Sequence, residues 1–135
     1  MTKYHGKCDC GAVQFDAEIE DPSAAIICYC NACKVRYGAF CPVYQVPDDK
    51  FTLTSGADKI KSYTYTGDSG LPVPCSFCLV CGTNVFREPQ FYTGKKVVIA
   101  GTLGEPWYNG ELKPSMTVYE NERLGWMSAG DLKSL

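Results

Sequence analysis

The cysteines of this chain stand in three tight groups whose spacing is typical of metal ligands. The chain has 135 residues and nine cysteines. The groups are Cys8 and Cys10, then Cys28, Cys30 and Cys33, then Cys75, Cys78 and Cys81, and Cys41 stands alone. Short turns with such spacings direct several thiolates toward one metal ion. We therefore expect the function to centre on bound metal.

The last group contains a zinc-knuckle pattern, CLVCG at residues 78–82. In this pattern the backbone N–H groups turn toward the first sulfur, and the glycine permits the positive φ that closes the turn. Its two cysteines supply half of a tetrahedral site. Cys8 and Cys10 are the favoured complement, because a closed four-thiolate site joins remote strands, and pairing with the middle group is the alternative.

The middle group, Cys28, Cys30 and Cys33, offers three ligands close together in the chain. Three protein ligands leave one tetrahedral position for water or substrate, which is the arrangement of catalytic zinc. An all-thiolate site is soft and suits the capture of a sulfur ligand. Completion by Cys41 or by an oxygen ligand would make the site structural instead, and spacing alone leaves both interpretations open.

Metal is favoured over disulfides for these cysteines. Their number is odd, and the N-terminal sequence MTKYHGKCDCG has no apolar segment that could act as an export signal. In a reducing compartment grouped cysteines indicate metal or catalysis, whereas in a secreted chain they would indicate a disulfide framework. We therefore expect a soluble, cytoplasmic protein.

Length and charge exclude several classes of function. At this length we expect a single domain, residues 1–135. The formal net charge is −2, and the basic residues are scattered, so nucleic acid is not an expected partner. No apolar run approaches the roughly 18 residues that span a bilayer, so no membrane association is expected. The partner predicted by the metal sites is a small-molecule thiol or thiol adduct.

The elements that must position the cysteines are mostly short β-strands. Residues 13–19 alternate apolar and polar side chains, which predicts a strand with one buried face. Cys8 and Cys10 are expected in the strand paired with it, with Gly11 at the turn, because residues i and i+2 of a strand share a face. Further strands are predicted at residues 24–28, 40–46, 51–54, 59–66, 73–77, 83–86 and 96–103.

One short helix is predicted among these strands. Residues 31–37 fit one or two helical turns, with Asn31 as the N-cap and Gly38 as the stop. From residue 105 onward the chain has aromatic side chains but weak periodicity. The predicted fold class is therefore all-β.

These motifs resemble those of the glutathione-dependent formaldehyde-activating enzyme family, also called the centromere protein V/GFA domain. The matching segments are G-x-C-x-C-G-x-V at 6–13, C-x-C-x-x-C at 28–33, F-C-x-x-C-G at 77–82 and G-T-L at 101–103. Trp126 also matches a tryptophan near the end of the family's domain. The resemblance spans nearly the whole chain. It implies the Mss4-like fold, in which short antiparallel strands form folded-over sheets with at most short helical turns.

The resemblance also implies two zinc ions and an activity. The structural zinc would be held by Cys8, Cys10, Cys78 and Cys81, and the catalytic zinc by Cys28, Cys30 and Cys33. The family's namesake reaction joins glutathione to formaldehyde and gives S-hydroxymethylglutathione. The expected function is thus a zinc-dependent carbon–sulfur lyase acting on glutathione or a glutathione adduct, with glutathione as co-substrate.

The chain departs from the family pattern at two positions near the triplet. Tyr29 stands where the family usually has histidine, and its hydroxyl could donate a proton or hydrogen bond to an oxyanion, or its ring could simply pack. Cys75 stands where the family often has arginine, so one anion contact is expected to be missing. Cys41 and Cys75 are then surplus thiols, either small buried hydrophobic residues or groups with a redox or substrate-bonding role.

Three polar residues follow the triplet closely and are candidates for binding the co-substrate. Asn31, Lys34 and Arg36 could hold a carboxylate of glutathione, or each could belong to a solvated face.

A different class of function stays open as the alternative. Proteins with the Mss4-like fold include non-catalytic zinc modules that chaperone a protein partner, and these need only the four structural cysteines. Methionine sulfoxide reductase chemistry is disfavoured, because it needs a cysteine late in the chain and none follows Cys81.

Overall fold

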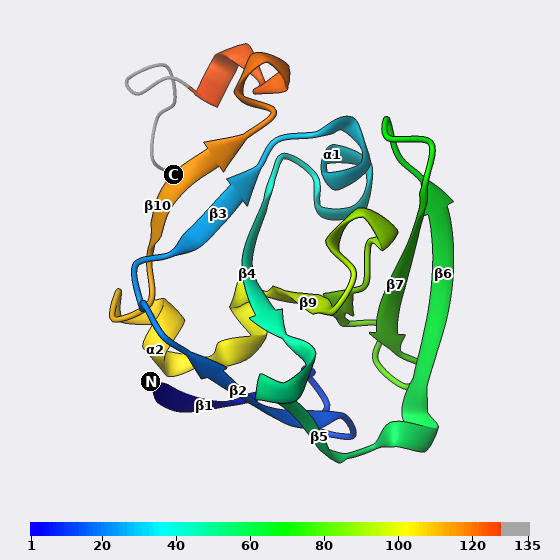
Figure 1. The fold of residues 1–135 in the computed structure, drawn as a ribbon, viewed down its shortest axis with the longest axis vertical. Coiled ribbons are helices and arrows are strands. Elements are labelled where there is room, and N and C mark those ends of the chain that lie inside the picture. The colour runs from blue at the N-terminus through cyan, green and yellow to red at the C-terminus, as the bar shows by residue number, and fades with distance from the viewer. Residues whose placement is uncertain (128–135) are drawn as a thin grey trace, which may run out of the picture.

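The computed structural model describes residues 1–127, which form two β-sheets (Figure 1). The three-stranded sheet has the order β1 (Thr2–Lys7), β2 (Gln14–Ile19), β5 (Phe51–Ser55). The seven-stranded sheet has the order β10 (Pro114–Val118), β3 (Ala25–Cys28), β4 (Cys41–Pro47), β9 (Lys95–Ile99), β8 (Asn84–Arg87), β7 (Pro72–Cys78), β6 (Ile60–Thr66). The prediction of an all-β fold is confirmed.

Helical segments are short. The two α-helices are α1 (Asn31–Tyr37) and α2 (Glu105–Tyr108). Single 3-10 turns span Asp48–Lys50, Ala57–Lys59, Gln90–Tyr92, Ala100–Leu103, Glu120–Glu122 and Gly125–Met127. Within residues 1–127 no helix has the length and apolar character needed to cross a membrane.

The hydrophobic core joins the two sheets. The predicted alternation in β2 is confirmed, since Phe15, Ala17 and Ile19 are buried while the residues between them are partly exposed. The Phe15 ring stacks on Phe51 of β5 with 5.0 Å between centroids, and Phe51 meets the edge of Phe86 of β8 at 5.1 Å. Burial of each such side chain contributes about 1.5–3 kcal/mol, so this aromatic row is a main link between the sheets.

Gly6 of β1 leaves room for the ring of Phe15, its register partner on β2. A Cβ atom at position 6 would overlap the ring carbons of Phe15. We expect Gly6→Ala to lower the free energy of unfolding by about 1–3 kcal/mol, the usual cost of overpacking a core. Urea unfolding measures this change. Gly101→Ala is the control, because a Cβ there meets no atom within 4 Å, and equal destabilisation by both variants would contradict the account.

Two predicted strands end earlier than expected. β1 stops at Lys7, and Cys8 and Cys10 lie in the turn after it, where the Cys8 N–H donates to Val13 O at 3.0 Å. β9 stops at Ile99, because residues 100–103 form a 3-10 turn in which the Thr102 hydroxyl donates to the Ile99 carbonyl at 2.7 Å. Side chains that bond nearby backbone in this way compete with a strand ladder.

The tail contains elements that the sequence did not reveal. β10 pairs in parallel with β3, which is the one parallel pair among the described strands, and α2 precedes it. Four of the five side chains of β10 are exposed, so the strand shows no apolar alternation.

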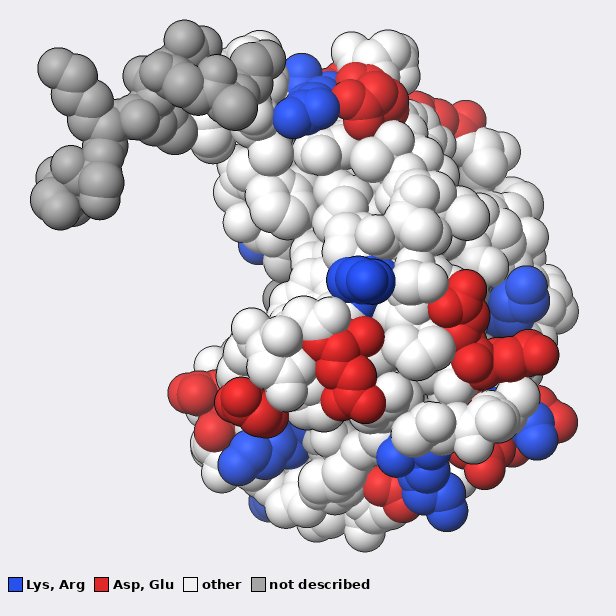
Figure 2. Space-filling model, turned by 90° about the vertical axis from the view of Figure 1, so that its left-hand side faces the viewer, with Lys and Arg blue, Asp and Glu red and all other residues white. Residues whose placement is uncertain are grey.

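One face of the molecule carries charged side chains of both signs (Figure 2). On the face in Figure 2, basic and acidic side chains are interspersed and no basic cluster gathers. That face therefore offers no basic patch for a nucleic acid backbone.

Candidate metal centres and adjoining cavity

Four cysteines from two distant parts of the chain meet in one cluster. The Sγ atoms of Cys8, Cys10, Cys78 and Cys81 all lie within 4.8 Å of one another. The Cys8–Cys10 and Cys10–Cys78 sulfur distances are 3.7 and 3.8 Å. A tetrahedron with metal–sulfur bonds of about 2.3 Å has edges of about 3.8 Å, so this donor set fits a four-thiolate zinc site. The structure brings together the four predicted ligands.

Two tight turns create this cluster. Gly11 in the turn after β1 and Gly82 in the turn after β7 both have φ of 79°, a conformation that glycine adopts without steric cost. The Val13 N–H donates to Cys8 Sγ at 3.3 Å. Hydrogen bonds to Cys81, first from the Thr83 side chain and then from backbone N–H groups, lower the pKa of Cys81 to about 6. Such donors favour thiolates, the form that binds metal.

The second cluster is the triplet Cys28, Cys30 and Cys33, whose Sγ atoms also lie within 4.8 Å of one another. Cys28 ends β3, and Cys33 lies in α1. Cys30 is the N-cap of α1, because its sulfur accepts the Cys33 N–H at 3.4 Å, so the prediction of Asn31 as the cap was wrong. Gly38 ends the helix as predicted. A single capping turn thus holds the triplet together.

Cys41 is a neighbour of the triplet rather than a member of it. It is the register partner of Cys28 on β4 and is 1 % exposed. Among residues 1–127 no carboxylate, histidine or fourth cysteine joins the three thiols as a compact group. The donor set fits a metal site with three protein ligands, and Cys41, whose thiol contacts that of Cys33, lies next to the compact group without being part of it.

The three thiols share their protons unequally. Hydrogen bonds from Cys28 and then Cys33 lower the pKa of Cys30 to about 2. The pKa of Cys28 is raised, first by hydrogen bonding to Cys30 and Cys33 and then by burial. Three sulfur ligands form a soft donor set that suits a soft cation.

Arg87 is a site residue that the sequence analysis missed. Its Nη1 donates to Cys33 Sγ at 3.4 Å, its side chain is 6 % exposed, and its Nε is buried without a hydrogen-bond partner. Burial lowers the pKa of this guanidinium, but the negative charge of Cys33 and neighbouring groups outweighs burial, and the pKa rises. Arg87 is the register partner of Cys75 on the adjacent strand. A cation therefore lies beside the triplet. It comes from the strand next to Cys75, the position at which an anion contact was expected to be missing.

We expect Arg87→Met to weaken metal binding by the triplet about 10- to 100-fold, the usual cost of removing a group that supports a metal ligand. Methionine keeps an unbranched chain in the space but removes the charge that faces Cys33. Competition with a chromogenic chelator measures the loss. Lys96→Met is the control, because Lys96 pairs with Asp48 and Glu88 away from the triplet. Unchanged metal affinity in the Arg87 variant would show that the guanidinium has no such role.

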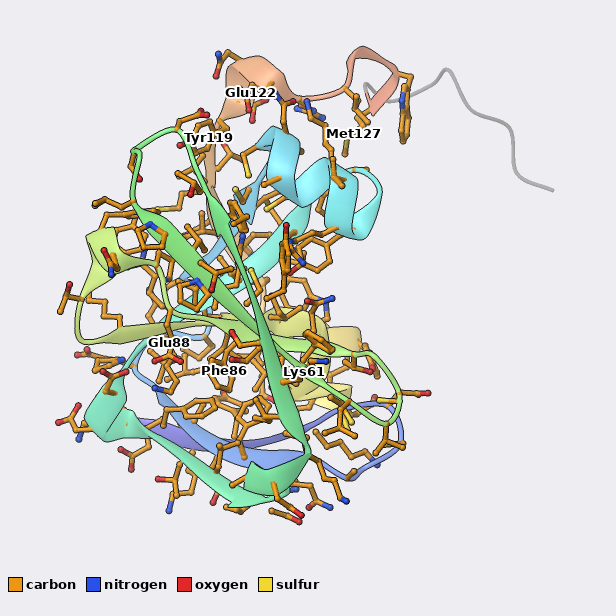
Figure 3. All side chains as sticks on the ribbon, turned by 90° about the vertical axis from the view of Figure 1, so that its right-hand side faces the viewer. Lys61, Phe86, Glu88, Tyr119, Glu122 and Met127 are labelled. Atoms are coloured by element: carbon orange, nitrogen blue, oxygen red, sulfur yellow. The ribbon has the colours of Figure 1, made fainter. Side chains whose placement is uncertain are left out.

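A cavity of about 400 Å³ adjoins the triplet, and Cys28, Cys30 and Arg87 line it. Apolar side chains of β3, β4, β7, β9 and β10 form part of its wall. They are Ile26, Val43, Val73, Val97 and Val118. Tyr119 and Glu122 also line it, and Figure 3 shows them at the end of the molecule near α1 and the tip of the β6–β7 hairpin. A molecule in this cavity can reach two of the three thiols.

The candidate co-substrate residues occupy different places. Asn31 lines the cavity, and its N–H donates to Glu122 Oε2 at 3.2 Å. Lys34 and Arg36 are not among the lining residues. Lys34 Nζ donates to the Glu122 carbonyl at 2.6 Å, and the Arg36 guanidinium lies 5.1 Å from the Tyr63 ring centroid. Lys34 thus links α1 to the segment that covers it.

Tyr29 lies beside the triplet in the chain but does not line the cavity. Its side chain is 7 % exposed and packs against Phe40, with 6.0 Å between ring centroids. The Arg123 guanidinium lies 5.5 Å from its ring centroid. This placement fits a packing role for Tyr29.

The nine cysteines, all of which fall within residues 1–127, are free thiols. Cys75 is buried and its Sγ lies 3.6 Å from the Val73 carbonyl oxygen, outside both clusters. The structure thus shows an all-β protein with two cysteine clusters that can bind metal, one of them beside a cavity.

Comparison with known proteins agrees with this class. Residues 3–122 match the model of the family described as glutathione-dependent formaldehyde-activating enzyme, and the chain belongs to that family. Among solved structures, the chain is similar to a protein of Rhodobacter sphaeroides, with a TM-score of 0.63 and 24% sequence identity. That match covers 82% of this chain and 99% of the other, and it shows a shared fold.

Proposed function

We propose that this chain is a single-domain, zinc-dependent carbon–sulfur lyase that joins glutathione to an aldehyde and, in reverse, splits the adduct. The observation that carries the proposal is the triplet at the wall of a cavity, with no fourth ligand grouped among the described residues. Membership of the family supports glutathione as the thiol. The free thiols suit the reducing cytoplasm, which we propose as the location.

The two clusters take different roles in this proposal. Cys8, Cys10, Cys78 and Cys81 hold a structural zinc that ties the turn after β1 to the turn after β7. Cys28, Cys30 and Cys33 hold the catalytic zinc. Zinc bound there would lower the pKa of a glutathione thiol and so supply a thiolate nucleophile at neutral pH.

The residues around the triplet then position the reactants. Arg87, fixed on Cys33, adds positive charge beside the reacting sulfur and has a free Nε in its buried environment. Asn31 lies at the cavity wall, where its side chain can bind a polar group of glutathione. We assign Lys34 and Arg36 to holding α1 against its neighbours, and Tyr29 to packing behind the triplet.

The reaction needs no oxidant or reductant. The sulfur of glutathione attacks the carbonyl carbon, so one S–C bond forms while the π bond of the carbonyl breaks, and the thiol proton ends on the carbonyl oxygen. Holding the two reactants together in the cavity removes much of the entropic barrier. The non-catalytic chaperone, the alternative function, leaves both the triplet and its cavity without a role.

Exchange NMR on mixtures of glutathione with formaldehyde and with larger aldehydes tests the proposal. The zinc-loaded protein is expected to raise the exchange rate between free thiol and adduct at least about tenfold for one or more aldehydes. Protein denatured by heat is the control for non-specific effects. A rate equal to the uncatalysed one for every aldehyde would refute the lyase and turn attention to a protein partner.

A further inference from the structure

The cavity beside the triplet is larger and more apolar than a one-carbon aldehyde requires. Its volume is about 400 Å³, within the range of roughly 300–1,000 Å³ found for small-molecule sites. A hydroxymethyl group on a sulfur at the triplet would fill only a small part of it. Glutathione itself takes up part of the remaining volume, and the apolar part of the wall is available to a larger substituent.

Part of the cavity wall consists of branched aliphatic side chains. Val43 is the register partner of Ile26, and Val97 is the register partner of Gln45, so adjacent strands present these residues along one sheet. Val43, Val73 and Val97 are each 5 % exposed or less. Such walls are firmly packed and favour an apolar group over water.

Aromatic side chains also line the cavity. Phe91 and Tyr92 meet edge to face with 4.7 Å between ring centroids, and they are 47 % and 38 % exposed. Tyr119 is 43 % exposed and has φ of 56°, the only positive φ outside glycine in the described chain. A left-handed non-glycine residue is strained and persists where its surroundings fix it. These exposed rings can pack on an aromatic ring of a ligand.

Charged groups at the cavity are few. Arg87 is the one basic lining residue of the described chain, and it is committed to Cys33. Asp68 and Glu122 are acidic and line the cavity. A carboxylate on the aldehyde-derived group, added to those of glutathione, would share the cavity with Asp68 and Glu122 and meet no further cation, so a neutral group fits best.

From these features we propose that the electrophile is an aldehyde with a neutral, apolar body of aromatic size, such as a phenyl or benzyl aldehyde, in preference to formaldehyde. This rests on the proposed thiol–aldehyde function and names its substrate class. The step is the same addition: the S–C bond forms at the aldehyde carbon, the thiol proton passes to the carbonyl oxygen, and nothing is oxidised or reduced. The apolar body lies against the valine and isoleucine wall and the exposed aromatic rings.

Binding of stable thioethers tests this specificity without turnover. In calorimetry S-benzylglutathione is expected to bind zinc-loaded protein at least about tenfold more tightly than S-methylglutathione, because the phenyl ring buries apolar area. Val118→Phe, which narrows the cavity, is expected to remove most of that tenfold preference. Val35→Phe is the control, since Val35 is 87 % exposed and lies outside the cavity. Equal binding of the two thioethers, or an unchanged preference in the Val118 variant, would overturn the inference.

Reaction rates with two aldehydes test the proposed substrate class separately from the proposed lyase function. With glutathione present, the unmodified enzyme is expected to show kcat/KM at least about tenfold higher for phenylacetaldehyde than for formaldehyde. A higher value for formaldehyde would overturn the substrate class while the lyase stands. No acceleration with either aldehyde would overturn both.

Discussion

Replacing Cys28 with serine is expected to abolish thiol–aldehyde catalysis while the fold persists. Cys28 ends β3, lines the cavity and is one of the three thiols of the triplet, so its loss leaves two ligands for the proposed catalytic zinc. We expect the rate of adduct exchange to fall at least about 100-fold. Loss of a residue that only supports a metal ligand already costs up to about 100-fold, and Cys28 is itself a proposed ligand. Metal content is expected to fall by about one zinc ion per chain.

The matched control for Cys28→Ser is Cys41→Ser. These two cysteines are register partners on β3 and β4, and both are buried, but only Cys28 belongs to the triplet. The Cys41 variant is expected to keep its metal and its activity within a few-fold of the unmodified protein. Circular dichroism checks that both variants keep their β-structure. Full activity in the Cys28 variant would rule out the triplet as the reaction site.

Replacing Cys78 with serine is expected to unfold the protein. Its sulfur joins β7 to the turn after β1, and the residues that it links lie 68 positions apart in the chain. Zinc held by four ligands contributes about 10–16 kcal/mol in small zinc modules, comparable with the roughly 5–15 kcal/mol that separates folded from unfolded domains. Loss of one ligand therefore removes stability that the core does not replace. Thermal unfolding is expected to lose its cooperative transition.

Cys75→Ser gives the matched control on the same strand. Cys75 and Cys78 are both 0 % exposed, but Cys75 lies outside the clusters and a serine hydroxyl can donate to the Val73 carbonyl that its thiol faces. We expect a loss of about 1–3 kcal/mol, the cost of burying a polar group in place of sulfur, with a cooperative transition retained. Equal damage from the two substitutions would mean that the four-thiol cluster stabilises the fold no more than an ordinary buried cysteine does.

Local patterns in the sequence were sufficient to predict the triplet of thiols that can bind metal. The spacing of Cys28, Cys30 and Cys33 restricts their sulfurs to one capping turn, whatever surrounds it. The alternation that predicts β2 is equally local, because its apolar side chains face one core. These features depend on a few consecutive residues, and a single sequence contains that information.

Features that depend on the register of distant strands could not be predicted. Arg87 reaches the triplet because β8 pairs with β7 and places it opposite Cys75, and no local pattern encodes that register. A charged residue directly after the apolar pair Val85 and Phe86 was the only available signal. The cavity could not be predicted for the same reason, since its wall is assembled from all seven strands of the larger sheet.

Helix geometry explains why the predicted co-substrate residues separate. Lys34 and Arg36 stand two positions apart on α1, and residues with that spacing point to different sides of a helix. Lys34 meets the Glu122 backbone, and Arg36 meets the tyrosines of β6. Only Asn31, at the first position of the helix, lines the cavity.

The metal content of the unmodified protein tests most directly whether each of the two clusters binds its own zinc ion. The chain, purified under reducing conditions and freed of loosely bound ions, is measured by inductively coupled plasma mass spectrometry against its protein concentration. We predict about two zinc ions per chain, one for each cysteine cluster. One zinc ion per chain, retained in the Cys28→Ser variant, would contradict the account, because the triplet would then hold no metal.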